Sequence, residues 1–207
     1  AYIHQYNYAK NYVDRLESIN FCSKNLTDLK AVELLKKALK DPHSGIREMV
    51  LGNISNIKDD KTKKLFESSL VELTKLEKKR TVKAELIDVL GGFKNLNLKG
   101  FFEENISDSS YSVSGASLTA LSKIDSILAL NYAEKLSKFP SKGKLDAAIN
   151  ILLIAAGKEE IFEKLEEKFK SLELSDEKFL MMQQIGEMAG KMKNSERIKK
   201  AISLIKP

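Results

Sequence analysis

The sequence predicts an all-α protein of about twelve helices that pair and stack into an elongated array. Only 10 of the 207 residues are glycine and 3 are proline, which is too few turn formers for an all-β sandwich or barrel. Several segments place apolar residues at i, i+3, i+4 and i+7, the spacing of an amphipathic helix. A block of residues also recurs every 31 to 36 positions, which is the period of stacked helical hairpins.

The recurring block consists of apolar residues spaced by about four, followed by a small residue. Its copies begin at six anchors, which are Val13, Ile46, Val82, Val113, Leu145 and Leu180. The copies at 46, 82 and 113 are the clearest, and the others are fainter. We interpret each copy as the inner helix of one hairpin, and residues 1–207 as a single repeat domain that shares one continuous core.

Amphipathic segments precede the inner helices. In residues 29–39, Leu29, Val32 and Leu35 share one face and lysines take the other. Residues 65–76 and 161–172 repeat this pattern, so each hairpin is predicted to pair a charged outer helix with a more apolar inner helix.

The turns between paired helices carry helix-breaking and acidic residues. Two of the three prolines, Pro42 and Pro140, fall between predicted helices, where the missing N–H does least harm. Acidic residues stand five positions before three anchors, at Asp41, Glu77 and Asp108, where a helix N-terminus favours an anion. The glycines of the inner helices are interpreted as points of close helix approach or as C-caps.

Two of the blocks resemble a known repeat family. The Asp-Pro-x-x-x-Ile-Arg run at 41–47 and the Val-Lys…Val-Leu-Gly run at 82–91 are similar to the second helices of HEAT repeats. The resemblance implies a right-handed α-solenoid of HEAT-like hairpins over nearly the whole chain.

The opening segment carries a second resemblance. Residues 8–19, with Asp14, Arg15, Glu17 and Ile19, are similar to the Asp-Arg-x-Glu-Ala-Ile segment that begins the helical C-terminal region of bacterial zinc aminopeptidases of the aminopeptidase N family; Ser18 replaces the alanine. The resemblance implies a non-catalytic C-terminal domain that covers the active site of a zinc metallo-aminopeptidase and limits peptide access. Its partners would be the catalytic domain of the same polypeptide and the peptide substrates.

The chain itself has few residues for catalysis. His4 and His43 each lack a second histidine four positions away, which the His-Glu-x-x-His zinc motif requires. Cys22 is the only cysteine, which excludes an internal disulfide and a cysteine-rich zinc site, and it is interpreted as a buried apolar residue. The serines between 107 and 117 form no nucleophile elbow and indicate a tightly packed helix. We therefore predict no catalytic, cofactor-binding or metal-binding residue here; zinc would belong to the parent's catalytic domain.

The charge balance leaves two other functions open. A net charge of +6 and lysine clusters at 61–64, 78–83 and 191–200 are compatible with a nucleic-acid-binding helical repeat. The lysines alternate with glutamates and no aromatic platform accompanies them, so nucleic acid is the less favoured partner. An independent HEAT-like scaffold that binds a protein along its inner helices is the stronger alternative.

The basic and acidic residues around the anchors are expected to have a structural role. We predict that Arg47 and Lys83, with Asp41 and Glu77, form a ladder between neighbouring repeats, and that replacing Arg47 by alanine costs about 1 kcal/mol. Adjacent glutamates such as Glu166 and Glu167 are interpreted as solvated, with Lys164 and Lys168 within i, i+4 reach.

The sequence shows no targeting or membrane signal. The longest apolar stretch, 147–156, contains Asn150 and is far shorter than the ~20 residues of a membrane span. The chain starts without methionine or an apolar leader, as an excised piece of a longer protein would, so its compartment stays open.

Overall fold

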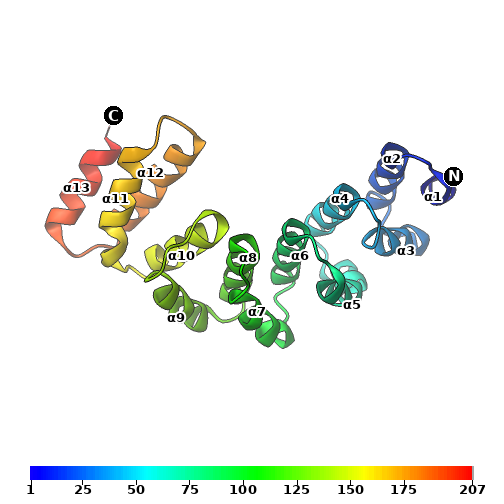
Figure 1. Cartoon of the computed structure of the whole chain (residues 1–207), viewed down its shortest axis with the longest axis horizontal. Helices are drawn as coiled ribbons and strands as arrows, with labels where there is room; N and C mark the ends of the chain where they lie inside the picture. The colour runs from blue at the N-terminus through cyan, green and yellow to red at the C-terminus, as the bar shows by residue number, and fades with distance from the viewer. Residues whose placement is uncertain (207) are drawn as a thin grey trace.

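A computed structural model describes residues 1–206, which form an all-helical arch (Figure 1). Within these residues there are thirteen α-helices, two short 3-10 helices and no strand. The α-helices are α1 (Tyr2–Tyr8), α2 (Tyr12–Ser23), α3 (Leu29–Ala38), α4 (Ser44–Ser55), α5 (Asp60–Leu76), α6 (Arg80–Gly92), α7 (Lys99–Ile106), α8 (Tyr111–Ser122), α9 (Ser126–Leu136), α10 (Gly143–Ala155), α11 (Phe162–Ser171), α12 (Asp176–Ala189) and α13 (Ser195–Ile205). The 3-10 helices are η1 (Leu96–Leu98) and η2 (Glu159–Ile161).

The helices alternate between the two sides of the arch. From α2 to α10 the even-numbered helices follow one another along the inner side, and α3, α5, α7 and α9 lie on the outer side (Figure 1). Each inner helix packs on the inner helix before it, from α2 on α4 to α8 on α10. The helices α11 to α13 form the C-terminal end of the arch, and only α12 continues the inner contacts, through a smaller contact with α10.

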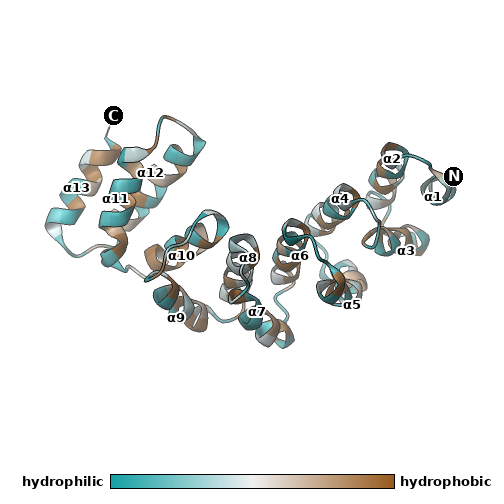
Figure 2. Cartoon of the chain, viewed as in Figure 1, coloured by the Kyte–Doolittle hydropathy of each residue, from teal (hydrophilic) through white to brown (hydrophobic). Residues whose placement is uncertain are grey.

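One hydrophobic cluster runs through the whole array, from Tyr6 in α1 to Ala201 in α13. The apolar residues gather where helices face each other and the polar residues line the outside (Figure 2). Four predicted anchors, Ile46, Val82, Val113 and Leu145, are buried and each is the third residue of its inner helix. The repeat found in the sequence therefore marks the same structural position in α4, α6, α8 and α10.

The two terminal anchors were placed in the wrong register. Val13 is 58% exposed and Leu180 is 55% exposed. In α2 the buried residues include Ile19 and Cys22, and in α12 they include Met181 and Ile185. The third residue of α2 is Asp14 and that of α12 is Lys178, so the position that holds the buried anchor in α4, α6, α8 and α10 is polar in these two helices, and apolar character alone does not identify the buried face.

The predicted outer helices and turns are confirmed, with apolar ends that stay exposed. Residues of α3, α5 and α11 bury one face as expected, but Leu29 at the start of α3 and Leu76 at the end of α5 are largely exposed. Pro42 lies between α3 and α4, and Pro140 lies between α9 and α10. Among residues 1–206, no helix is long and apolar enough to cross a bilayer.

Candidate interaction surface

A ladder of ion pairs links successive inner helices. The cation is the fourth residue of α2, α4 and α6, and the carboxylate precedes the next inner helix by a fixed distance. The three rungs are Arg15–Asp41 at 3.0 Å, Arg47–Glu77 at 2.7 Å and Lys83–Asp108 at 3.2 Å. The rungs lock the rotation of each helix pair relative to the next.

Each carboxylate of the ladder also fixes its own turn. The side chains of Asp41, Glu77 and Asp108 accept the backbone N–H two residues ahead, from His43, Lys79 and Ser110, each at 2.8 Å. The donors His43, Lys79 and Ser110 are the N-cap residues of α4, α6 and α8. One carboxylate therefore satisfies a free donor at the helix start and the cation of the preceding repeat.

The central rung is well shielded from solvent on both sides. The Arg47 side chain is 14% exposed and the Glu77 side chain is 4% exposed. The guanidinium donates to both oxygens of Glu77 and to the carbonyls of Asp41 and Pro42. Burial alone would raise the pKa of Glu77, but hydrogen bonds from Arg47 and from the Lys79 and Lys78 backbone outweigh it, so its pKa lies below the usual value.

The ladder predicted from the sequence is confirmed, with a different pairing and one more rung. Arg47 reaches the carboxylate of the following turn, Glu77, while its contact with Asp41 is to the backbone. The carboxylate of Asp41 accepts hydrogen bonds from Arg15 at 3.0 Å and from the hydroxyl of Tyr6 at 2.8 Å. Arg15 was noticed only as part of the opening segment, because its 26-residue distance from Asp41 gives no local signal.

A second arrangement spans α8 on the inner side of the arch. Helix α8 is packed so closely that a Cβ on Gly115 would lie 2.5 Å from the backbone of Lys144, and a Cβ on Gly91 of α6 would lie 2.6 Å from the Cβ of Ala120. Because small residues let α6 and α10 approach α8 closely, Lys144 of α10 reaches across α8 to the carboxylate of Asp88 on α6. Helices α7 and α9 cover the other side of α8, so this bridge lies on the inner face.

Carboxylates gather beside this bridge. Glu85 lies on the solvent-facing stripe of α6 with Asp88, and Glu48 of α4 is near enough to affect it. Burial, together with the charges of Glu48 and Asp88, raises the pKa of Glu85. Within residues 1–206, Glu85 has no ion-pair partner, so this part of the inner face carries an unneutralised negative charge.

About half of the lysines in the clusters noted in the sequence form ion pairs. Lys63 bonds to Asp60, Lys79 to Glu48, and Lys191 to Glu187. The lysines of α11 differ from expectation, because Lys164 contacts Asp146 of α10, and Lys168 contacts Glu177 of α12 at 3.1 Å and Asp146 at 3.7 Å. The positive surplus is therefore spread out.

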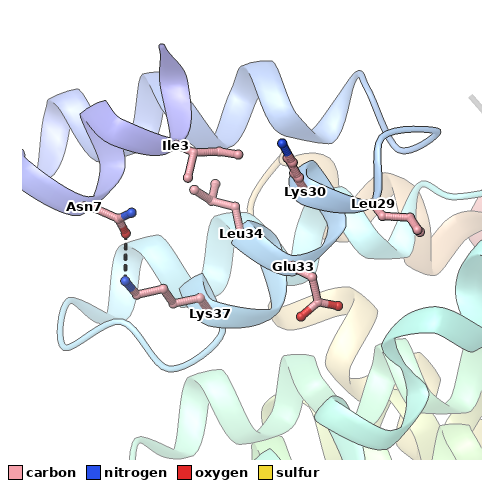
Figure 3. Close-up of a pocket in the computed structure, with 7 residues that line it drawn as sticks. All are labelled: Ile3, Asn7, Leu29, Lys30, Glu33, Leu34 and Lys37. Atoms are coloured by element: carbon pink, nitrogen blue, oxygen red, sulfur yellow. Dashed lines mark hydrogen bonds between the residues drawn. The ribbon is translucent and has the colours of Figure 1, made fainter.

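A groove lies at the N-terminal end of the array, between α1 and α3 (Figure 3). It encloses about 410 Å³, and Ile3 and Leu34 form its apolar floor. The amide of Asn7 accepts a hydrogen bond from Lys37 at 2.7 Å and closes one end. The groove is apart from the inner face and holds no catalytic group.

The histidines, the cysteine and the buried serines of α8 form no catalytic group with one another within residues 1–206. The ring of His43 stacks on Tyr12 at 4.4 Å, and that of His4 lies 4.4 Å from Tyr8. Cys22 is buried, and burial raises the pKa of its thiol. The hydroxyls of Ser114 and Ser117 are buried and donate to backbone carbonyls, as the tight packing of this helix predicts. Over residues 1–206 no three metal-ligating side chains come together.

Neither the models of known protein families nor the sequences of curated proteins match this chain.

Proposed function

We propose that the chain is the non-catalytic C-terminal helical domain of a zinc metallo-aminopeptidase of the aminopeptidase N family. Its helix pairs would be HEAT-like repeats in a right-handed solenoid, and its inner face would cover the catalytic cleft. The observation that carries the proposal is that the opening segment, residues 8–19, starts the first inner helix of a row of locked helix pairs. That order of elements is the one the resemblance implies.

The mechanism of such a domain is steric and does not require its own catalytic groups. Three ladder rungs and the close packing around α8 make the section from α2 to α10 a stiff curved wall. A stiff wall over a cleft admits peptides by size and orientation, because bending it to admit a larger one would break buried ion pairs. The zinc and the general base would come from the catalytic domain.

The opening segment has a structural role in this wall. Arg15 makes the first rung, with Asp41. Glu17 accepts a hydrogen bond from Gln5 of α1 at 2.7 Å. The residues that carry the resemblance therefore fasten the first helices together, which supports a boundary role for this segment.

The coding sequence upstream of Ala1 gives the first test. The proposal requires a His-Glu-x-x-His zinc motif and a Gly-x-Met-Glu-Asn-like substrate motif there, and their absence would overturn it. The isolated chain 1–207 should bind no stoichiometric zinc and hydrolyse no aminoacyl substrate.

A second test addresses the steric mechanism. The full enzyme and a version that lacks residues 1–207 are compared on an aminoacyl chromogenic amide and on a peptide of about ten residues. We expect the ratio of kcat/KM for the long peptide to that for the amide to rise when the domain is removed. An unchanged ratio in a folded, zinc-loaded truncation would contradict the covering role and would favour the alternative of an independent protein-binding scaffold.

Nucleic acid remains the weaker alternative. Several lysines of the basic clusters are paired with carboxylates, and Glu85 on α6, which forms no ion pair within residues 1–206, repels phosphates. A salt-sensitive complex with a DNA or RNA duplex in a gel shift would reverse this ranking.

A further inference from the structure

The regular ladder of ion pairs ends at α8. The fourth residue of α8 is Ser114, which donates to the carbonyl of Ile106, and the turn position that would hold the next carboxylate is Pro140. The bridge from Lys144 to Asp88 replaces the missing rung and ties α10 back to α6. Helices α2 to α10 are therefore held by ion pairs and close backbone contacts throughout.

The junction between α10 and the C-terminal helices is built differently. The fourth residue of α10 is a carboxylate, Asp146, which is only 5% exposed. It accepts hydrogen bonds from Lys164 of α11 at 2.7 Å and from Ser141 at 3.1 Å, and Lys168 lies 3.7 Å away. Charge polarity is thus reversed relative to the ladder, with the acid on the inner helix and the cations on the outer helix.

One buried polar atom at this junction is unsatisfied. Asn150 lies one turn after Asp146, is 3% exposed and donates to Asp146 at 3.3 Å. Its carbonyl oxygen accepts no hydrogen bond from any residue between 1 and 206. A buried acceptor without a donor is costly, and opening the junction to water would remove that cost.

The helices beyond the junction form a unit of their own. Arg197 of α13 bonds to Glu163 of α11 at 2.7 Å, and Glu159 in η2 accepts N–H groups at the start of α13. The link to α10 is short and contains Gly157, whose φ of +68° lies in the left-handed region. Figure 1 shows α11, α12 and α13 side by side at one end of the arch.

We propose that the α10–α11 junction is a hinge, about which the α11–α13 unit swings relative to the stiff α2–α10 section, and that the Asp146–Lys164–Lys168 cluster holds it closed. The pivot is the Gly157 link. This inference is independent of the proposed function. Its physical basis is that the α11–α13 unit meets the rest of the array mainly through the smaller α10–α12 contact and the Asp146 cluster, whereas α4, α6, α8 and α10 pack on one another over larger contacts.

The charges explain how the closed position is held. Burial alone would raise the pKa of Asp146, but the hydrogen bond and charge of Lys164 outweigh it, so the pKa lies below the usual value and the carboxylate is charged at neutral pH. Lys164 and Lys168 are 46% and 39% exposed. Salt therefore reaches the cationic side of the cluster and weakens it.

The test measures the distance between two spin labels on either side of the hinge. The labels are attached at Ser55→Cys in α4 and Lys199→Cys in α13, both exposed positions, in a Cys22→Ala background. In Asp146→Asn we expect a distance distribution about twice as wide as in the unsubstituted chain, as hinge motion produces. The matched control is Asp108→Asn, which breaks a ladder rung between the same two labels and should leave the distribution unchanged, because the close contact of Gly91 with Ala120 still holds α6 against α8.

The outcomes separate a hinge from general loosening. Equal widths in Asp146→Asn and the parent, or equal broadening in Asp108→Asn, would overturn the inference. If circular dichroism shows that Asp146→Asn does not fold, the exposed pair Lys164→Gln and Lys168→Gln tests the same cluster, and an unchanged width would be decisive against it. Raising NaCl from about 0.05 M to about 0.5 M should broaden the parent distribution as well.

Discussion

Replacing Arg47 by alanine tests whether the ladder stabilises the fold. The substitution removes a bidentate ion pair with Glu77 and two hydrogen bonds to the carbonyls of Asp41 and Pro42. Glu77, with a side chain only 4% exposed, would keep its charge with only backbone donors nearby. Exposed ion pairs contribute at most about 1 kcal/mol, whereas breaking a buried one costs about 3–5 kcal/mol.

Arg47 lies between these limits because its own side chain is 14% exposed. We therefore expect the free energy of unfolding to fall by about 2–3 kcal/mol, which exceeds the 1 kcal/mol expected from the sequence because the pair is bidentate and shielded. At about 2–4 °C per kcal/mol for a chain of this size, Tm should fall by about 4–12 °C.

Thermal and urea unfolding followed by far-UV circular dichroism measure this change. The matched control is Lys40→Ala, since Lys40 pairs with Glu72 at a similar 2.9 Å but both side chains are about half exposed, at 48% and 58%. Lys40→Ala should cost less than about 1 kcal/mol. If Arg47→Ala costs no more than Lys40→Ala, the ladder does not stabilise the array and the reasoning is wrong.

Three further predictions follow from packing and burial. Gly115→Ala should lower the free energy of unfolding by about 1–3 kcal/mol or more, because the added Cβ would lie 2.5 Å from backbone atoms. Gly52→Ala is the control, since its Cβ would meet nothing within 4 Å, and it should raise the free energy of unfolding by up to about 1 kcal/mol. Chemical denaturation measures both changes. Glu85→Gln should raise stability at pH 7 by about 0.5–1 kcal/mol, since burial beside other carboxylates raises the pKa of Glu85. The gain should shrink as the pH falls through this raised pKa and be lost below about pH 4.5, where the carboxyl is protonated in both the folded and the unfolded state. Burial, with the hydrogen bond to Asp41, raises the pKa of Tyr6. The protonated phenol therefore stabilises the fold below the unfolded-state pKa of about 10, and this stabilisation is lost as the pH rises above that value. Between about pH 9 and 11, the Tyr6→Phe protein should lose less stability than the parent.

The fold class was predictable because helical periodicity and the repeat are local in the sequence. Four anchors fell on the third residue of an inner helix because apolar spacing and burial coincide where a helix has neighbours on both sides. The same spacing failed at Val13 and Leu180, because the third residue of α2 is Asp14 and that of α12 is Lys178, which are polar. Periodicity identifies an apolar face, and only the neighbours decide whether that face is covered.

The candidate surface was predictable only in part. Acidic residues before the anchors could be recognised from their spacing, but their partners could not, because each rung joins residues 25 to 30 positions apart. The bridge from Lys144 to Asp88 spans 56 positions and depends on the thinness of α8. Its sequence signal is indirect, through the small residues that let α6 and α10 approach each other.

The fourth residue of the inner helices α2 to α10 corresponds to the kind of contact that each makes with the next repeat. A cation at this position, as in α2, α4 and α6, is stable only if the following turn supplies a carboxylate, because a partly buried cation without a partner is costly. Pro140 supplies none, and the corresponding residue in α8 is the neutral Ser114. The carboxylate Asp146 in α10 then requires cations from the next outer helix, which are Lys164 and Lys168. At each of these helices the fourth residue thus complements the charge of the group that faces it. The type of linkage between helices changes at α10, although the apolar core continues without a break to α13.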